Sequence, residues 1–138
     1  MCGSRSFIKE IRKIGDEVSK LGHQVILPPS SEGVAPRIKE NRELFLRLKP
    51  KYMREHLENI QKGDAILVCN FEKEGKNYIG GNTFAEILFA WFLNKKIYFL
   101  NPIPEDEHFY EELIAIRPII IGKRKLEKVL SELHDKDV

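Results

Sequence analysis

Two short segments of the chain combine glycine, hydroxyl and charged side chains in an order that suits ligand chemistry. The first is Gly3-Ser4-Arg5-Ser6, which leads into a helical pattern. Free backbone N–H groups at a helix start favour an anion, and an arginine such as Arg5 can grip phosphate through two hydrogen bonds. A simpler interpretation is that Ser4 or Ser6 caps the helix. The two interpretations are compatible, because a capping residue can also contact a ligand.

The second segment ends at Glu86 and begins with Gly80, Gly81, Asn82 and Thr83. The pattern Thr-x-x-Glu is a capping box, which gives this glutamate a purely structural explanation. The two glycines before it lack Cβ atoms, so a ligand can approach the backbone closely there. A carboxylate one turn into the helix, facing such a gap, is well placed to act on a sugar. The local pattern favours the cap, and the second interpretation stays open.

The remaining candidate groups are less specific. His56 lies one turn from Tyr52 and Ile60 in a helical pattern, where a histidine is more often a packed or surface residue than a catalyst. Cys2 and Cys69 show no metal-ligand spacing and no disulfide framework. We therefore expect both cysteines to be small core residues, and we expect neither a metal site nor a cofactor.

Length and composition limit the class of protein. The chain has 138 residues, of which 42% are hydrophobic and 32% charged, which indicates one folded domain over 1–138 rather than a disordered chain. Its 23 basic and 21 acidic residues give a net charge of +2, too balanced to favour a nucleic acid polymer as partner. The sequence has no apolar run of membrane-spanning length and no signal-peptide pattern, so we expect a cytoplasmic protein without a membrane partner.

Hydrophobic spacing predicts alternating strands and helices. Apolar runs predict strands at 24–27, 65–69, 97–100 and 119–121, with a very short first strand at Met1 and Cys2. Helical spacing predicts helices over 5–21, 37–48, 50–62, 83–94, 106–116 and 123–134. Gly22 suits the end of the first helix. Pro50 separates the second helix from the third, because proline costs about 3 kcal/mol inside a helix.

This alternation predicts an α/β fold with a three-layer, flavodoxin- or Rossmann-like, five-stranded parallel sheet of order 2-1-3-4-5 and helices on both faces. Ligands bind such sheets at the carboxyl ends of strands, where the strand order reverses. That point lies between the first and third strands, and the chain leaves them through 3–6 and 70–86. The candidate ligand-binding residues are therefore Gly3, Ser4, Arg5, Asn70, Gly80, Gly81, Asn82 and Thr83.

Three motifs, in order and spacing over nearly the whole chain, resemble the nucleoside 2-deoxyribosyltransferase family and its relatives, the deoxynucleoside 5′-monophosphate N-glycosidases. The motifs are Cys2-Gly3-Ser4-Arg5, the run from Glu55 to Asp64 (EHLENIQKGD) and the run from Gly81 to Glu86 (GNTFAE). The glycine-rich turn before Thr-Phe-x-Glu is also similar to the motif of cytokinin-type phosphoribohydrolases.

The resemblance implies that Glu86 is a nucleophile, which attacks C1′ of a (deoxy)nucleoside or nucleotide and displaces the base. The reaction passes through an oxocarbenium-like state that a carboxylate stabilises and then captures. The start Cys-Gly-Ser-Arg looks closer to the nucleotide hydrolases, which implies that Arg5 holds a 5′-phosphate. Neighbouring subunits complete each other's sites in this family, so the resemblance also implies a homo-oligomer.

The sequence departs from the family pattern at two places. His56 stands where the family usually has an aspartate that orients the sugar, although a histidine can act as acid or base near neutral pH. The stretch 78–81 (Tyr-Ile-Gly-Gly) lacks the acidic residue with which the transferases contact the base. These departures keep two alternatives open: a non-catalytic nucleotide-binding or sensing protein of the same fold, and a phosphoribohydrolase-like enzyme.

Overall fold

The computed structural model describes residues 1–29 and 41–132, which form a mixed α/β fold. Its main sheet has three parallel strands in the order β1-β4-β5, with bounds Ala65–Val68, Lys96–Phe99 and Ile119–Ile120. Ala65 pairs with Lys96 at one end of this register, and Phe99 pairs with Ile120 at the other. The strand neighbours agree with the predicted order of the third, fourth and fifth strands.

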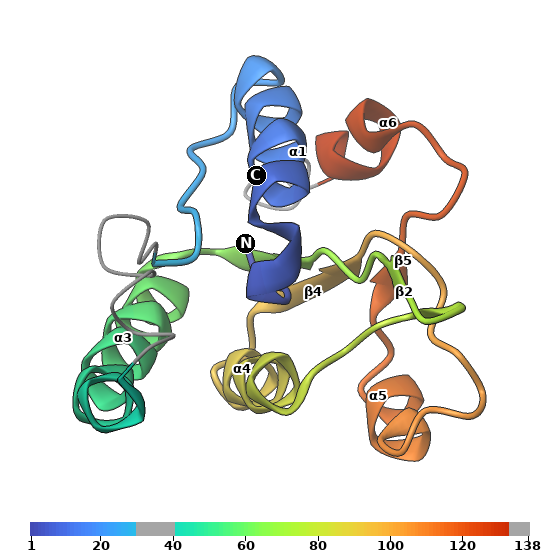
Figure 1. The fold of residues 1–138 in the computed structure, drawn as a ribbon. Coiled ribbons are helices and arrows are strands. Elements are labelled where there is room, and N and C mark those ends of the chain that lie inside the picture. The colour runs from blue at the N-terminus through green and yellow to red at the C-terminus, as the bar shows by residue number, and fades with distance from the viewer. Residues whose placement is uncertain (30–40, 133–138) are drawn as a thin grey trace.

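Helices cover both faces of the sheet (Figure 1). On one face lie α1 (Ile8–Lys20), which follows the short helix η1 (Arg5–Phe7), and α6 (Leu126–Ser131). On the other lie α4 (Gly81–Phe92) and α5 (Tyr110–Ala115), and α3 (Arg42–Lys62) packs beside α4. The predicted three layers are therefore present. Within the part of the chain that is described, no helix combines the length and apolar character needed to cross a membrane.

The core has two halves because the central strands are buried on both faces. In β1, Ile66 and Val68 pack with the α4 and α5 side, whereas Leu67 and the following Cys69 pack with the α1 and α6 side. Side chains of successive strand residues point to opposite faces, and continuous apolar runs are typical of parallel strands covered on both sides. The buried sheet therefore fixes the positions of the segments that follow its strand ends.

Of the five predicted parallel strands, the described residues show three as regular strands, and both edge segments are irregular. Cys2 makes a single parallel bridge to Val68, and the Met1 amino group donates to the Ile26 carbonyl oxygen at 2.8 Å. The segment 24–27 thus lies beside the N-terminus without forming a strand. Ile26 and Leu27 are exposed, so little packing favours a regular edge there.

The separation of two helices at Pro50 is wrong, because α3 runs through this residue without a break. The proline removes one N–H donor, whose acceptor would be the carbonyl of Leu46. Pro50 and Leu46 are both exposed, so water can reach that carbonyl. Of the predicted helix 37–48, residues 37–40 fall outside the described residues.

The other differences are at element ends. The first helix begins with the 3-10 turn η1, and Gly22 follows its end with a φ of 92°, as predicted for its cap. Helices α5 and α6 are shorter than predicted, and residues 133–134 lie outside the described residues. The predicted loop 70–82 contains a small hairpin, formed by β2 (Glu72–Lys73) and β3 (Lys76–Asn77).

Candidate functional site

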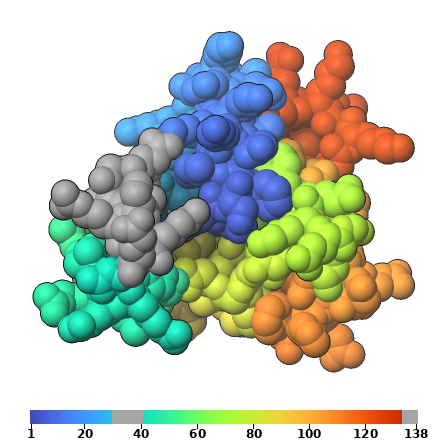
Figure 2. Space-filling model, viewed as in Figure 1, coloured from blue at the N-terminus to red at the C-terminus, as the bar shows by residue number. Residues whose placement is uncertain are grey.

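A cavity of about 840 Å³ opens at the carboxyl end of β1, beside the N-terminal segment. In Figure 2 the N-terminal segment, α3 and the hairpin segment gather on one face of the molecule. The cavity is lined by the N-terminal segment with the start of α1, by one side of α3, and by the turn and first residues of α4. The predicted candidates that line it are Gly3, Ser4, Arg5, His56, Gly80, Gly81, Asn82, Thr83 and Glu86.

Glu86 does not form the predicted capping box. Helix α4 begins at Gly81, and its N-cap is Gly80, which makes no side-chain capping bond. Thr83 therefore lies inside the first turn and is buried, whereas Glu86 lies in the second turn. The cap interpretation is wrong because the helix starts before Thr83. The glutamate carboxylate is consequently free for another partner.

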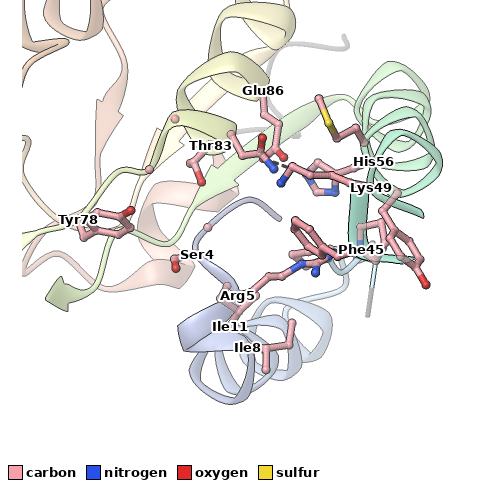
Figure 3. A pocket seen from close by; sticks show the side chains of 18 of the residues that line it. Ser4, Arg5, Ile8, Ile11, Phe45, Lys49, His56, Tyr78, Thr83 and Glu86 are labelled. Atoms are coloured by element: carbon pink, nitrogen blue, oxygen red, sulfur yellow. Dashed lines mark ion pairs between the residues drawn. The ribbon is translucent and has the colours of Figure 1, made fainter. Parts of the chain in front are cut away.

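That partner is His56 of α3. Its Nε2 atom lies 3.2 Å from Oε2 of Glu86, and the two side chains are 7% and 18% exposed. Figure 3 shows them pointing toward each other across the gap between α3 and α4. The Cys2 Sγ atom lies 3.5 Å from the same Nε2 atom. Burial is the main reason that the pKa of the Cys2 thiol is raised far above its ordinary value, so this thiol is protonated at neutral pH.

The other ring nitrogen of His56, Nδ1, is buried and has no hydrogen-bond partner among the described residues. A hydrogen on Nε2 is placed to be donated to the Glu86 carboxylate. This arrangement gives His56 a positioning role, because it orients a carboxylate that faces the cavity.

Among the described residues, positive side chains line the cavity near the acidic side chain of Glu86. Arg5, Arg42 and Lys49 line it together with Glu86. Arg5 lies over the Tyr52 ring, at 5.6 Å from its centroid, and Lys49 lies over the Phe45 ring at 5.3 Å. Figure 3 shows Arg5 and Lys49 extending from opposite walls. Aromatic faces and guanidinium groups are suited to an aromatic base and an anionic group respectively.

The N-terminal segment combines a cap with a tightly packed turn. The Ser4 side chain accepts a hydrogen bond from the Ser6 backbone N–H at 3.4 Å, as the capping interpretation predicted. A Cβ atom on Gly3 would lie 3.0 Å from both the Cys69 carbonyl oxygen and Ile11 Cδ1. Close packing against the sheet therefore favours glycine at this position, independently of any ligand.

The glycine turn before α4 is open at only one of its two glycines. A Cβ atom on Gly81 would meet nothing within 4 Å, whereas one on Gly80 would lie 3.1 Å from the Tyr78 hydroxyl. Gly81 and Asn82 are exposed. Close approach of a ligand to the backbone is consequently possible at Gly81, and Tyr78 occupies the space beside Gly80.

Asn70 does not line this cavity. It is fully buried, and its side chain clamps the ends of β1 and β4 together. Nδ2 donates to the Asn101 carbonyl oxygen at 2.8 Å, and Oδ1 accepts from the Asn101 N–H at 2.9 Å. Because both ends of the amide are occupied, we assign Asn70 a structural role and leave it out of the site.

Sequence reasoning missed the contribution of α3 apart from His56. The missed lining residues on this helix are Arg42, Phe45, Lys49, Tyr52 and Met53. Their spacing of three or four residues places them on one helix face, which was the available signal. Met53 is 43% exposed, because this part of the face borders the cavity instead of the core.

Comparison of the chain with protein-family models, with curated proteins and with solved structures finds no match. The likeness to the 2-deoxyribosyltransferases therefore rests on the three motifs alone. The fold and the site define an α/β protein with a carboxylate–histidine pair at a sheet-end cavity, and function has to be argued from that geometry.

Proposed function

We propose that this protein cleaves or transfers the N-glycosidic bond of a (deoxy)nucleoside or nucleotide, with Glu86 as the nucleophile. The observation that carries the proposal is the position of Glu86 in the cavity. Its carboxylate is not used as a helix cap and is held by His56 at 3.2 Å, and basic and aromatic side chains line the same cavity. The motif resemblance supports the same role for the same residue.

The proposed reaction has two steps. A Glu86 carboxylate oxygen bonds to C1′ while the C1′–N bond breaks, and the electron pair leaves with the base, which takes a proton from water. Water, or a second base in a transfer reaction, then attacks C1′ and frees the carboxylate. His56 Nε2–H stays hydrogen-bonded to Glu86 and keeps the attacking oxygen oriented, which reduces the entropy lost in reaching the transition state.

The basic residues favour a substrate that carries an anionic group. Arg5 follows the Ser4 cap at the cavity wall, and Arg42 and Lys49 lie on the α3 side. Arginine binds phosphate through paired hydrogen bonds, so we favour a nucleoside monophosphate over a free nucleoside.

Two finer features belong to the same proposal. We propose that Met1–Cys2 and 24–27 act as the two further strands of a five-stranded sheet. Cys2 already makes two backbone hydrogen bonds, to Leu67 and Cys69, and the Met1 amino group donates to the Ile26 carbonyl oxygen. We also propose a cytoplasmic homo-oligomer. Trp91 and Phe92, at the end of α4, are 53% and 75% exposed, and covering such side chains favours association with a second copy.

The experiment is an assay for free base with a panel of nucleosides and nucleoside monophosphates. We expect release by the wild-type protein and loss of release in Glu86→Gln, which keeps the shape of the side chain but removes its charge. Glu43→Gln is the matched control, since Glu43 is an exposed α3 residue that pairs with Arg47. Tight binding of a nucleotide without base release would instead establish the sensing protein.

A further inference from the structure

We propose that Cys2, His56 and Glu86 form a binding site for one zinc ion at the base of the cavity, with the fourth coordination position open to the cavity. The three side chains offer a sulfur, a nitrogen and an oxygen donor, and these atoms all lie within 4.8 Å of one another. They are the donor types that zinc binds in proteins. The described residues contain no other such group of three.

Two of the three donor separations fit tetrahedral coordination, and the third, between the Cys2 and Glu86 donors, is within 4.8 Å. Sγ of Cys2 and Nε2 of His56 are 3.5 Å apart, and Nε2 and Oε2 of Glu86 are 3.2 Å apart. An ion at about 2.3 Å from sulfur and about 2.05 Å from nitrogen and oxygen would then see donor pairs at roughly 107° and roughly 103°. Both angles are close to the tetrahedral value of about 109°.

The orientation of the histidine supports the same site. Nε2 is the atom that faces both Cys2 and Glu86, so once its hydrogen is displaced its lone pair is available beside the other two donors. Cys2 is held by backbone bonds to Leu67 and Cys69, and the other two donors stand on helices. Donors fixed by separate rigid elements need little rearrangement to bind a metal.

The cavity supplies the path and the open position. His56 and Glu86 both line it, whereas Cys2 is fully buried behind them. Zinc sites with three protein ligands leave their fourth position to water or a substrate atom. A zinc ion here would therefore carry a cavity water and act on it as a Lewis acid.

Binding exchanges protons in a defined way. The ion takes Cys2 as a thiolate, and the displaced thiol proton goes to solvent. The hydrogen on His56 moves from Nε2 to Nδ1, and Glu86 binds as a carboxylate. Because the thiol must lose its proton, affinity rises with pH. Nδ1 has no partner among the described residues, and lack of such support weakens zinc sites about 10–100-fold, so we expect micromolar affinity.

The zinc site is independent of the proposed glycosidic reaction, but zinc binding and that reaction would compete for Glu86. A zinc ion on Glu86 would occupy the carboxylate proposed to attack C1′, so metal-loaded protein would release no base by that route. Metal binding is measured without substrate, so its failure leaves the glycosidic proposal untouched, and failure of the glycosidic proposal leaves the metal site untouched.

The test is titration of the metal-free full chain with zinc against a chromophoric chelator, at near-neutral pH. We expect one ion per chain in the wild type and at least about tenfold weaker binding in Cys2→Ser, since serine is a poor zinc ligand. Cys69→Ser is the matched control, because Cys69 is a second buried thiol outside the cluster. Its affinity should equal that of the wild type.

The absorption spectrum of the cobalt-loaded protein gives a second measurement, which a change in folding alone would not reproduce. Cobalt-loaded wild type and Cys69→Ser should show a sulfur-to-cobalt charge-transfer band, and Cys2→Ser should lack it. Should Cys2→Ser fail to fold, Glu86→Gln replaces it and should bind zinc at least about tenfold more weakly. The proposal is overturned if the wild type binds no zinc at micromolar concentration. It is also overturned if Cys2→Ser or Glu86→Gln binds zinc as well as the wild type.

Discussion

Nε2 of His56 and Oε2 of Glu86 lie 3.2 Å apart across the gap between α3 and α4, with both side chains mostly buried. The two residues are 30 positions apart in the sequence and stand on different helices. The pair links the helix that carries most of the basic and aromatic lining to the helix that follows the glycine turn. It is the geometric centre of the proposed chemistry.

Replacing His56 should slow turnover more than it weakens binding. A hydrogen bond to a charged group contributes about 1.5–3 kcal/mol, so His56→Ala should lower kcat about 10–100-fold with a small change in KM. His56→Gln, which restores an N–H donor, should recover part of the loss. Steady-state base release measures both, and His108→Ala, at an exposed histidine, is the control. An unchanged kcat in His56→Ala would rule out the positioning role.

The preference for a phosphate-bearing substrate should depend on Arg5. We expect Arg5→Ala to raise KM about tenfold for a nucleoside monophosphate, through loss of a charge-assisted pair of hydrogen bonds, and to leave KM for the nucleoside unchanged. Arg47→Ala is the matched control, because Arg47 is an exposed arginine paired with Glu43 outside the cavity. If the wild type turned over both substrates equally and Arg5→Ala had no effect, the proposal that Arg5 binds a substrate phosphate would be wrong.

Asn70 should matter for stability and not for substrate binding. Asn70→Ala removes the two bonds that its side chain makes to Asn101 and leaves the Asn101 N–H without its partner, which should lower the free energy of unfolding by about 2–4 kcal/mol. Asn77→Ala removes one exposed bond to the Pro102 carbonyl oxygen and should cost less than about 1 kcal/mol. Urea unfolding measures both. Equal costs for the two variants would contradict the clamp.

Alkaline pH should destabilise the fold through Cys69. Burial raises the pKa of this thiol from 9.0 to about 12, so the unfolded chain loses its proton first as pH rises. The stabilising effect is complete below pH 9, and above it the free energy of unfolding should fall by up to about 1.4 kcal/mol per pH unit. Urea unfolding between pH 8 and pH 10.5 should show a shallower decline in Cys69→Ala. Identical slopes in both proteins would refute the thiol contribution.

The sequence predicts the layers well because the apolar runs of β1 and β4 and the stripe of α1 are strong periodic signals. It is wrong at Pro50, where exposure makes a proline tolerable within α3. At 24–27, where Ile26 and Leu27 are exposed, the structure shows no regular strand. These outcomes depend on tertiary surroundings, which local propensity does not contain.

The sequence also predicts which segments meet at the candidate site, because the order of the strands determines this. In a parallel sheet of this order, the segments that follow neighbouring strands meet at the same edge. The segment 3–6, after the bridge at Cys2, therefore lies near 80–86, which follows β1 along the chain. The orientation of Glu86 depends on where α4 begins, and Gly80 rather than Thr83 proved to be the cap. The sequence did not predict the lining face of α3. Apolar Phe45 and charged Lys49 alternate along this face, which is typical of a cavity wall and not of a core stripe.

The most direct measurement is mass spectrometry of the protein after incubation with a 2′-fluorinated nucleoside monophosphate. Fluorine beside C1′ destabilises the oxocarbenium-like state and slows release of a glycosyl-enzyme. We expect one sugar phosphate attached to wild type, carried by the peptide that contains Glu86, and none on Glu86→Gln. Free base released by wild type without any adduct on that peptide, or an adduct that persists in Glu86→Gln, would contradict Glu86 as the nucleophile.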